Sequence, residues 1–467
     1  MSTEQVVFSR HDPGTSEREW WAAPQWQDVP ALDTQEVVRR HPHVLVVAAH
    51  PDDEAIGIGG LLSDLAGLGA RLTVLLATSG ERSHELPDED SRSALARARR
   101  RESERALLGL APGAEIVHLG LPDTRVCDVE EVVAAAVAER AGPDTLVLAP
   151  WFEDGHTDHD AVGRAARAAG AAVGLAVAFY PIWLWHWSTP ESMTWDRLVA
   201  VEVSLTGCWR KRAALEEFRS QTRAIGIPDG SEHRDTPVIT AELQQRSTRL
   251  VETLLDPCGV LPVRTAEVDA SRVAARTAGF DEMYDHSGDP WRFSGSFYEQ
   301  RRRALVLAVL GRASYGRVLE IGCADGGLTR ALVERSPAVT ALDTSARAVD
   351  AAHAAAPTAS VSRGEAPTAM PAGPFDLVLL SEVGYFLSPL ELMATLRRAV
   401  ASLAAGGEIV LCHWQHPTLG VPLDGALVHE QAAAVMGRPP RASYRDGDLA
   451  IDVWGEGETL AEQEGRA

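Results

Sequence analysis

The fold of the first half of the chain is decided by one stretch, Val44-Leu45-Val46-Val47-Ala48-Ala49-His50-Pro51-Asp52-Asp53-Glu54. Its apolar part is continuous, which favours a strand that is buried on both faces of a parallel sheet. The same arrangement recurs further on, where Thr145-Leu146-Val147-Leu148-Ala149 precedes Gly155-His156-Thr157-Asp158-His159. Functional groups in open α/β sheets collect at the carboxyl ends of the strands. We therefore expect the two polar clusters to meet at one edge of a sheet.

Apolar strands and helices alternate from His41 onward. The expected strands are 44–49, 72–77, 115–119, 145–149, 175–180 and 199–204, and the expected helices are 57–68, 92–109, 129–140, 160–170 and 208–224. Such alternation predicts a parallel sheet that helices cover on both faces. Residues 1–40 are rich in Pro, Trp and charge, and we expect an extended lead-in that packs on the first domain, residues 41–260.

A second α/β series follows a polar stretch that contains Pro257, Gly259, Pro262 and Gly279. We expect a linker at 261–280 and a second domain at 281–467. The expected strands are 317–321, 338–342, 375–380 and 407–412, and the expected helices are 296–310, 327–335, 345–355 and 389–404. A chain of 467 residues is long enough for about two to three domains. The sequence thus predicts two three-layer α/β domains.

The composition narrows the class of partner. A net charge of −22 argues against nucleic acid, whose binders present a basic surface, and favours a small molecule or glycoconjugate. The five cysteines are scattered without a CxxC pair, which suits reduced thiols in a cytosol. The N-terminus lacks the regions of a signal peptide, and no apolar run approaches bilayer length. We expect a cytoplasmic protein without a membrane span, and its oligomeric state stays open.

The first pair of clusters offers ligands for a divalent metal ion. We expect His50, Asp53 and His159 to bind zinc or another divalent cation. Three protein ligands leave a further position for water or a substrate carbonyl, as in a catalytic zinc site. The ion would lower the pKa of that water and polarise the carbonyl, which predicts a metal-dependent hydrolase.

The remaining polar residues of these clusters are candidates for proton transfer. We expect Asp52 to be the general base, and His156 to stabilise the oxyanion or protonate the leaving amine. Asp158 is expected to orient a neighbouring histidine. A simpler reading is that Asp52 and Asp53 cap the helix that follows them.

The first motif, Ala49-His50-Pro51-Asp52-Asp53-Glu54, resembles the signature of the PIG-L/LmbE-like zinc deacetylases, which remove acetyl groups from N-acetylated amino sugars. The resemblance covers about residues 12–255. It implies that His50, Asp53 and His159 bind zinc, that Asp52 is the base and that His156 is the electrophilic partner. The chain departs from the family pattern at Thr157, where Pro is more common, and at Phe218, where many relatives have a His.

A second candidate site follows the strand Arg317-Val318-Leu319-Glu320-Ile321, in the stretch Gly322-Cys323-Ala324-Asp325-Gly326-Gly327. Glycines let the backbone approach a nucleotide closely. Asp343 ends the following strand, where a carboxylate can hold the hydroxyl groups of a ribose. We expect Glu320, Gly322, Cys323, Gly326 and Asp343 to line a cofactor site, although a plain tight turn or a dinucleotide site would share the glycines.

This layout resembles the class I S-adenosylmethionine-dependent methyltransferases. The flanking segments Asp289-Pro290-Trp291-Arg292-Phe293 and Ser381-Glu382-Val383-Gly384-Tyr385-Phe386 are similar to the NodS-type N-methyltransferases. The resemblance covers about residues 280–415 and implies S-adenosyl-L-methionine as cofactor. Glu382 would lie near the transferred methyl group and bind the acceptor amine. The alternative is that Glu382 and Tyr385 cap the next helix.

The two resemblances predict two Rossmann-like domains, an LmbE-like deacetylase followed by a methyltransferase. A deacetylase exposes a primary amine and an N-methyltransferase consumes one, so we expect consecutive steps on one amino sugar. Three alternatives stay open. The domains act on different molecules, with methyl transfer to oxygen or to a non-sugar amine; the first domain hydrolyses another amide; or one half is a binding module without catalysis.

Overall fold

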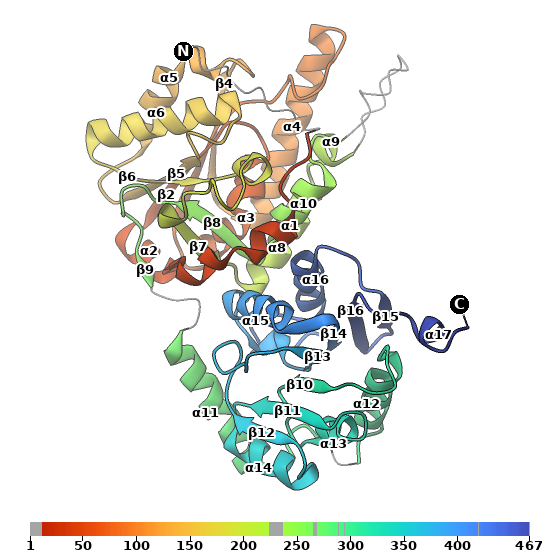
Figure 1. Ribbon diagram of the computed structural model, residues 1–467. Helices are drawn as coiled ribbons and strands as arrows, with labels where there is room; N and C mark the ends of the chain where they lie inside the picture. Colours follow the sequence, from red (N-terminus) through yellow and green to blue (C-terminus); the bar gives the residue numbers. More distant parts are fainter. Residues whose placement is uncertain are drawn as a thin grey trace. The chain divides into compact units, whose positions relative to one another are not determined.

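The chain divides into two compact units, Met1–Ala266 and Glu267–Ala467, and each has its own sheet and hydrophobic core (Figure 1). The computed structural model describes residues 12–223, 237–264, 269–287, 289–293, 295–418 and 420–466. Helices cover both faces of each sheet. The predicted class of two three-layer α/β domains is therefore confirmed.

A nine-stranded sheet forms the centre of the first unit, in the order β4-β3-β2-β5-β6-β8-β7-β1-β9. Its strands are β1 (Ala31–Leu32), β2 (His43–Ala48), β3 (Arg71–Thr78), β4 (Glu115–Leu121), β5 (Thr145–Pro150), β6 (Ala176–Tyr180), β7 (Leu198–Glu202), β8 (Val251–Leu255) and β9 (Val263–Arg264). Strands β2 to β6 pair in parallel. Every residue of β2 and β5 is buried, as expected for strands covered on both faces.

The prediction of a parallel sheet is wrong for part of the first sheet, which is mixed. Strand β8 is antiparallel to β6 and β7, and β9 is antiparallel to β1. The apolar pattern does not reveal β8, because Glu252 interrupts it. That carboxylate is buried since Lys211 Nζ donates to it at 2.6 Å and the N–H of Gly60 donates at 2.8 Å.

Long helices pack on the two faces of this sheet (Figure 1). Helices α3 (Asp53–Gly67), α4 (Glu89–Leu110) and α8 (Leu205–Leu215) contact one another, and α5 (Glu130–Arg140) contacts α6 (Thr157–Val173). Connections β2-α3-β3 and β5-α6-β6 move in opposite directions along the sheet. Since such crossovers are right-handed, α3 and α6 lie on opposite faces. The shorter helices are α7 (Leu184–Trp187), α9 (Arg219–Thr222) and α10 (Ala241–Ser247), with η2 (Val126–Asp128) and η3 (Trp195–Arg197).

The N-terminal segment is helical over part of its length rather than extended. Its described elements are α1 (Glu17–Ala22), η1 (Pro24–Asp28), β1 and α2 (Thr34–Arg40). Trp20, Trp21 and Trp26 are at most 1% exposed, and the Trp20 ring lies 4.6 Å from that of Trp185. Burial of three large side chains stabilises compact local structure. Residues 1–11 lie outside the described part of the chain.

The topology of the first sheet brings the two polar clusters together. Strand β2 lies between β3 and β5, so the order of the strands reverses at this point. His43 aligns with Thr145 and Val46 with Leu148, which sets the carboxyl ends of β2 and β5 level. The turns that carry the two clusters therefore meet at the switch point of the sheet, where ligands bind in such folds.

The second unit contains a seven-stranded sheet in the order β12-β11-β10-β13-β14-β16-β15. Its strands are β10 (Arg317–Ile321), β11 (Ala338–Asp343), β12 (Ser360–Arg363), β13 (Phe375–Ser381), β14 (Leu403–Trp414), β15 (Ala442–Arg445) and β16 (Leu449–Gly455). Strands β10 to β14 pair in parallel, whereas β16 is antiparallel to β14 and β15. The switch point of this sheet lies at β10, between β11 and β13.

Helices α15 (Pro389–Ala401) and α16 (Gly425–Met436) contact each other on one side of this sheet (Figure 1). The other helices are α11 (Ala270–His286), α12 (Phe297–Val309), α13 (Gly327–Leu332), α14 (Ala346–Ala355), η4 (Gly384–Phe386) and α17 (Leu460–Gln463). Residues 261–280, expected as a linker, hold β9 and the first turns of α11. Strand β9 pairs with β1 of the first unit, while Arg276 of α11 pairs with Glu391 at 2.8 Å within the second.

Two properties of the whole chain follow from these elements. Among the described residues, no helix combines the length and apolar composition that crossing a bilayer requires. All five cysteines are free thiols, of which Cys208, Cys323 and Cys412 are buried and Cys127 and Cys258 are exposed.

Candidate active sites

The turn after β2 places Asp52 and Asp53 at the start of α3. Asp52 has a φ of 135°, which is strained for a residue other than glycine. Its side chain makes no capping hydrogen bond to α3. Asp53 Oδ2 instead accepts a hydrogen bond from the N–H of His50 at 2.8 Å. The helix-capping interpretation therefore does not explain Asp52.

Asp53 lies between the imidazole rings of His50 and His159. Its Oδ2 is 3.5 Å from His50 Nδ1, and its Oδ1 is 3.3 Å from His159 Nε2. The ring of His156 lies 5.0 Å from that of His50 and 4.7 Å from that of His159. One ligand atom from each of these three histidines lies within 4.8 Å of the other two. The fold thus brings together all the side chains that the sequence suggests as metal ligands.

Three further carboxylates contact the outer sides of two of these rings. Asp154 Oδ2 lies 2.7 Å from His159 Nδ1, while Asp158 Oδ2 and Asp123 Oδ1 lie 3.2 Å and 3.3 Å from His50 Nε2. Carboxylates in such positions fix the orientation and tautomer of an imidazole. Asp158, from the second cluster, thus contacts His50 of the first cluster. Asp123 and Asp154 were not among the expected site residues, and their only sequence signal is a position just after β4 and β5.

The pKa values reflect an excess of negative charge around Asp53. Burial alone would lower the pKa of His159, but Asp53 and Asp154 outweigh it and raise that pKa to about 10. Burial disfavours an ionised Asp53, yet His159 and His50 hold its pKa well below the usual range. A site that holds a proton this firmly favours a cation beside Asp53, either the proton or a metal ion.

Asp52 and His156 have different electrostatic environments. Burial raises the pKa of Asp52 to about 7, although Arg99, whose Nη2 lies 3.1 Å from Asp52 Oδ2, opposes the rise. Burial and the other two histidines hold the pKa of His156 well below its usual value. His156 Nδ1 accepts a hydrogen bond from the N–H of Asp158 at 3.3 Å, so the neutral ring carries its proton on Nε2. Asp52 is thus a buried carboxyl group beside Arg99, and His156 is a neutral ring with an N–H group at Nε2.

Arg99 and Glu54 support this turn from α4 and α3. Arg99 is 3% exposed and donates to the carbonyl oxygens of Gly80 at 2.8 Å and Pro51 at 2.9 Å. Burial raises the pKa of Glu54 to about 8, and Ser103 donates to its Oε1 at 2.9 Å. Arg99 lies in a run of arginines on a polar helix, so nothing in the sequence separates it from its exposed neighbours.

The Phe218 side chain is fully buried in the core of the first unit. The departure noted at this position is therefore a core residue in this chain.

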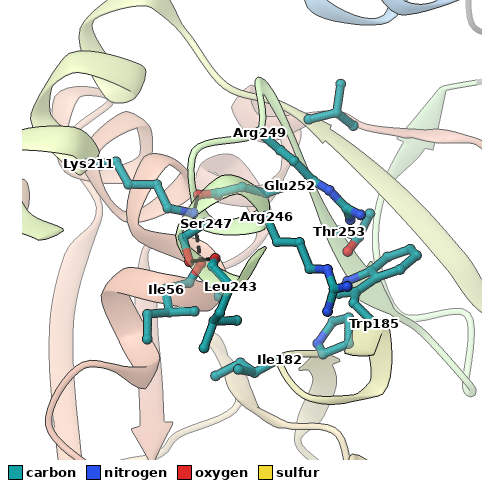
Figure 2. Close-up of a pocket in the computed structure, with 13 residues that line it drawn as sticks. Ile56, Ile182, Trp185, Lys211, Leu243, Arg246, Ser247, Arg249, Glu252 and Thr253 are labelled. Carbon is teal, nitrogen blue, oxygen red and sulfur yellow. Dashed lines mark hydrogen bonds and ion pairs between the residues drawn. The ribbon is translucent and has the colours of Figure 1, made fainter. Parts of the chain in front are cut away.

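A small pocket of the first unit has none of the His and Asp residues of the cluster in its wall (Figure 2). Figure 2 shows Lys211 directed toward Glu252 on one side and Arg246 beside Trp185 on the other. Its cavity volume of about 30 Å³ has room for one or two water molecules. The pocket is therefore too small for a substrate, and the paired charges in its wall are structural.

In the second unit, the turn after β10 requires glycine at two positions. Gly322 and Gly326 have φ values of 77° and 73°. A Cβ atom at Gly326 would lie 2.6 Å from Ala352 Cα, and one at Gly322 would lie 2.1 Å from a methyl carbon of Val383. Only glycine fits both the backbone conformation and the space. Cys323, between them, is buried.

The predicted acidic residues flank this turn. Glu320 is 2% exposed, accepts a hydrogen bond from Thr329 Oγ1 at 2.6 Å, and has a pKa that burial raises to about 8. Asp343 accepts from the N–H groups of Ala324 and Ser345, both at 3.0 Å. Asp343 therefore ties the turn after β10 to the turn after β11. The fold brings the five expected cofactor residues of these turns to one edge of the sheet.

The turn after β13 carries Glu382 in a left-handed conformation, with a φ of 61°. Tyr385 donates its hydroxyl to Glu382 Oε2. Glu382 Oε1 and the Tyr298 hydroxyl are both buried, and neither has a hydrogen-bond partner among the described residues. The cap of the next helix, α15, is Ser388 rather than Glu382. The helix-capping interpretation is therefore wrong for Glu382.

Comparisons with known proteins give the same division of the chain. Residues 45–170 match the family model described as PIG-L, GlcNAc-PI de-N-acetylase, and residues 282–415 match that of nodulation protein S (NodS). A 2'-N-acetylparomamine deacetylase from Streptomyces fradiae is 36% identical over 34% of this chain and 63% of its own length. Nodulation protein S from Rhizobium tropici is 29% identical over 26% of this chain, which spans 53% of that relative.

A solved structure of the N-methyltransferase NodS from Bradyrhizobium japonicum WM9, in complex with S-adenosyl-L-homocysteine, is 23% identical. It covers 39% of this chain and 100% of its own, with a TM-score of 0.35.

The two sites define a class of protein, a two-domain α/β protein with one polar site at the switch point of each sheet. Within that class, residues 45–170 of the first domain are similar to the PIG-L family and residues 282–415 of the second are similar to the NodS family.

Proposed function

We propose that this chain is a bifunctional enzyme that hydrolyses the N-acetyl group of an amino sugar or glycoconjugate and then methylates the freed amine. The observation that carries the proposal is the position of Asp53 between His50 and His159, with the buried base Asp52 beside it. The family matches support both halves, because relatives of the first domain are named deacetylases of N-acetylated sugars and a relative of the second is a named N-methyltransferase.

The donor set of the first site fits a divalent metal ion. One carboxylate, Asp53, and two imidazoles, His50 and His159, form a combination that suits zinc and leaves room for a further ligand. Such an ion, when bound, polarises the amide carbonyl and makes water a stronger nucleophile. Asp158 and Asp154 would keep the two rings in the orientation that binding requires.

Asp52 carries the proton transfers of hydrolysis. It takes a proton from the attacking water, since its pKa of about 7 suits a base near neutral pH, and then delivers that proton to the leaving amine. The neutral His156 ring donates a hydrogen bond from Nε2 to the oxyanion and keeps its proton. The products are acetate and a primary amine.

The second domain would use S-adenosyl-L-methionine as methyl donor, as the bound product in a NodS structure suggests for the family. Asp343 would bind the ribose hydroxyls, and Glu320 with the backbone of Gly322, Cys323 and Gly326 would line the remainder of the cofactor. Glu382 Oε1 would accept a hydrogen bond from the acceptor amine and keep its lone pair directed at the methyl carbon. Orientation of this kind supplies much of the acceleration in methyl transfer.

Mass spectrometry of the purified full chain tests the proposal. The chain is incubated with zinc, S-adenosyl-L-methionine and either 2'-N-acetylparomamine or 1D-myo-inositol 2-acetamido-2-deoxy-α-D-glucopyranoside. We expect loss of the acetyl group followed by gain of a methyl group on the same molecule. Loss of the acetyl group alone would contradict the tandem reaction and leave the deacetylase. No change with either substrate would contradict both steps for this substrate class.

Two neighbouring variants separate the base from the ligand. Asp52→Asn should lower deacetylation by about 10²- to 10⁴-fold while bound zinc stays near the wild-type level. Asp53→Asn should lose both activity and zinc, because it removes a charged ligand. Equal zinc content in both variants would contradict these assignments.

A further inference from the structure

The C-terminal segment of the second unit consists of α16, β15 and β16, which lie between Gly425 and Gly455. Strand β16 pairs along β14 and α16 contacts both η4 and α15. This C-terminal segment therefore packs beside the turn that carries Glu382.

A series of buried hydrogen bonds links the C-terminal segment to that turn. The N–H of Gly384 donates to His413 Nε2 at 3.0 Å. His413 Nδ1 lies 3.1 Å from His429 Nε2, and His429 Nδ1 lies 2.6 Å from Asp452 Oδ2. The exposed fractions of His413, His429 and Asp452 are 0%, 4% and 2%. The whole series of hydrogen bonds from Gly384 to Asp452 is thus sheltered from water.

The donor at one end fixes every proton in this series. Because Gly384 donates to His413 Nε2, that nitrogen is unprotonated and Nδ1 of the neutral ring carries the hydrogen. His413 Nδ1 then donates to His429 Nε2, and His429 Nδ1 donates to Asp452. Burial lowers the pKa of both histidines, which keeps the rings neutral. Asp452 also accepts from Arg445 at 2.7 Å and Ser443 at 2.6 Å, so the acceptor end is held ionised.

The same residues pack directly on Gly384. A Cβ atom at Gly384 would lie 2.6 Å from Val428 Cγ1 and 3.0 Å from His413 Nε2. The backbone of the turn at Gly384 is therefore in close contact with both Val428 and the His413 ring that accepts its hydrogen bond. Glu382, two residues earlier, keeps its strained φ of 61°, a conformation that persists only where surrounding contacts enforce it.

We propose that His413, His429 and Asp452 are positioning residues for methyl transfer, which hold the turn after β13 so that Glu382 Oε1 stays available to the acceptor amine. This inference rests on the proposed methyltransferase function. Its structural basis is a contrast in hydrogen bonding. The buried Glu382 Oε1 and Tyr298 hydroxyl have no hydrogen-bond partner among the described residues, whereas every ring nitrogen of His413 and His429 has a partner. The C-terminal segment would therefore act on the acceptor side and leave the cofactor side, at β10 and β11, unchanged.

Steady-state kinetics of full-length variants test the functional part. In His413→Leu the N–H of Gly384 loses its acceptor, and we expect kcat for methylation of paromamine to fall by about tenfold or more. The Kd for S-adenosyl-L-methionine should stay within about twofold. His413→Gln, which places an oxygen near the position of Nε2, should keep kcat within about threefold of the wild type. The control is His416→Leu, because His416 forms an exposed pair with Asp448 at 2.7 Å.

Hydrogen exchange tests the structural part without any acceptor. We expect His413→Leu and Asp452→Asn to speed amide exchange in the peptide that contains Gly384, and His416→Leu to leave it unchanged. Amide exchange at the wild-type rate in both His413→Leu and Asp452→Asn would overturn the proposal. So would a loss of affinity for S-adenosyl-L-methionine in His413→Leu that is as large as its loss of kcat. If the wild type methylates neither paromamine nor glucosamine, the proposed function fails for these acceptors, while faster exchange would still establish that the series of hydrogen bonds holds the turn.

Discussion

Asp154, which lies outside the quoted motif, fixes the orientation of His159, a candidate metal ligand. Its carboxylate accepts from His159 Nδ1 at 2.7 Å and from the N–H groups of Ile182, Trp183 and Leu184 at 2.9–3.0 Å. Three backbone donors hold the carboxylate in place, so the imidazole has a single orientation and tautomer.

We predict that Asp154→Asn lowers the affinity for zinc by about 10- to 100-fold, because a neutral amide fixes the ring less firmly and makes it less basic. Zinc titration of metal-free protein measures the change. Asp128→Asn is the matched control, since Asp128 forms an exposed pair with Arg125 at 2.7 Å. Equal affinities in the wild type and Asp154→Asn would show that the ring needs no such support.

Glu320 makes a prediction about stability and pH. Its pKa is about 8 in the folded chain, against an ordinary value of 4.5, because burial disfavours the ionised form. Folding stability that depends on a protonated Glu320 is therefore fully present below the pKa of Glu320 in the unfolded chain, and it is lost as the pH rises toward 8. The Glu320→Gln variant lacks this titration. As the pH rises, its free energy of unfolding should therefore increase relative to that of the wild type, by up to about 1.4 kcal/mol per pH unit.

Denaturant unfolding of cofactor-free wild type and Glu320→Gln at pH 5.5 and pH 8 measures this difference, since all other titrating groups are shared. If the difference in unfolding free energy between the wild type and Glu320→Gln is the same at both pH values, Glu320 is already ionised in the folded chain. The same variant should bind S-adenosyl-L-methionine more weakly, because the carboxylate is a proposed contact of the cofactor.

At the scale of elements, the turn between β10 and α13 depends on backbone shape more than on side chains. We predict that Gly326→Ala destabilises the second unit by about 1–3 kcal/mol. The added methyl group would meet Ala352 of α14, in a conformation with a φ of 73°. Calorimetry should also show lost cofactor binding. Gly447→Ala is the control, because a Cβ there has no atom within 4 Å.

The elements also show where sequence patterns stop being informative. Strands β2, β5 and β10 are continuous apolar runs, and their predicted positions agree with the structure to within a residue or so. Strand β8 contains Glu252, and β16 contains Asp452, yet both lie inside their sheets and both carboxylates are buried. Each carboxylate is paired by residues far away in sequence, Lys211 and His429, so no local pattern reveals the strand.

At the scale of the whole molecule, each unit has its own core and its own site, so the two reactions should be separable. We predict that a mixture of Asp52→Asn and Glu382→Gln chains forms the deacetylated and methylated product, although neither chain forms it alone from the N-acetylated substrate. Mass spectrometry of the mixture measures this. If only the deacetylated amine accumulates, the second domain does not methylate the amine from solution, and the two reactions are not separable in this way.

The sequence by itself determined the two α/β series and the turns that carry His50, Asp53, His159 and the glycines around Cys323. Those features depend on local hydrophobic periodicity and on residues beside strand ends, which a chain shows without being folded. Only the tertiary structure decided which carboxylate faces which ring, as for Asp154 on His159 and Asp452 on His429. It also decided that β8 and β16 run antiparallel. Such contacts join residues through space, and their energy comes from burial and pairing that exist only once the strands have assembled.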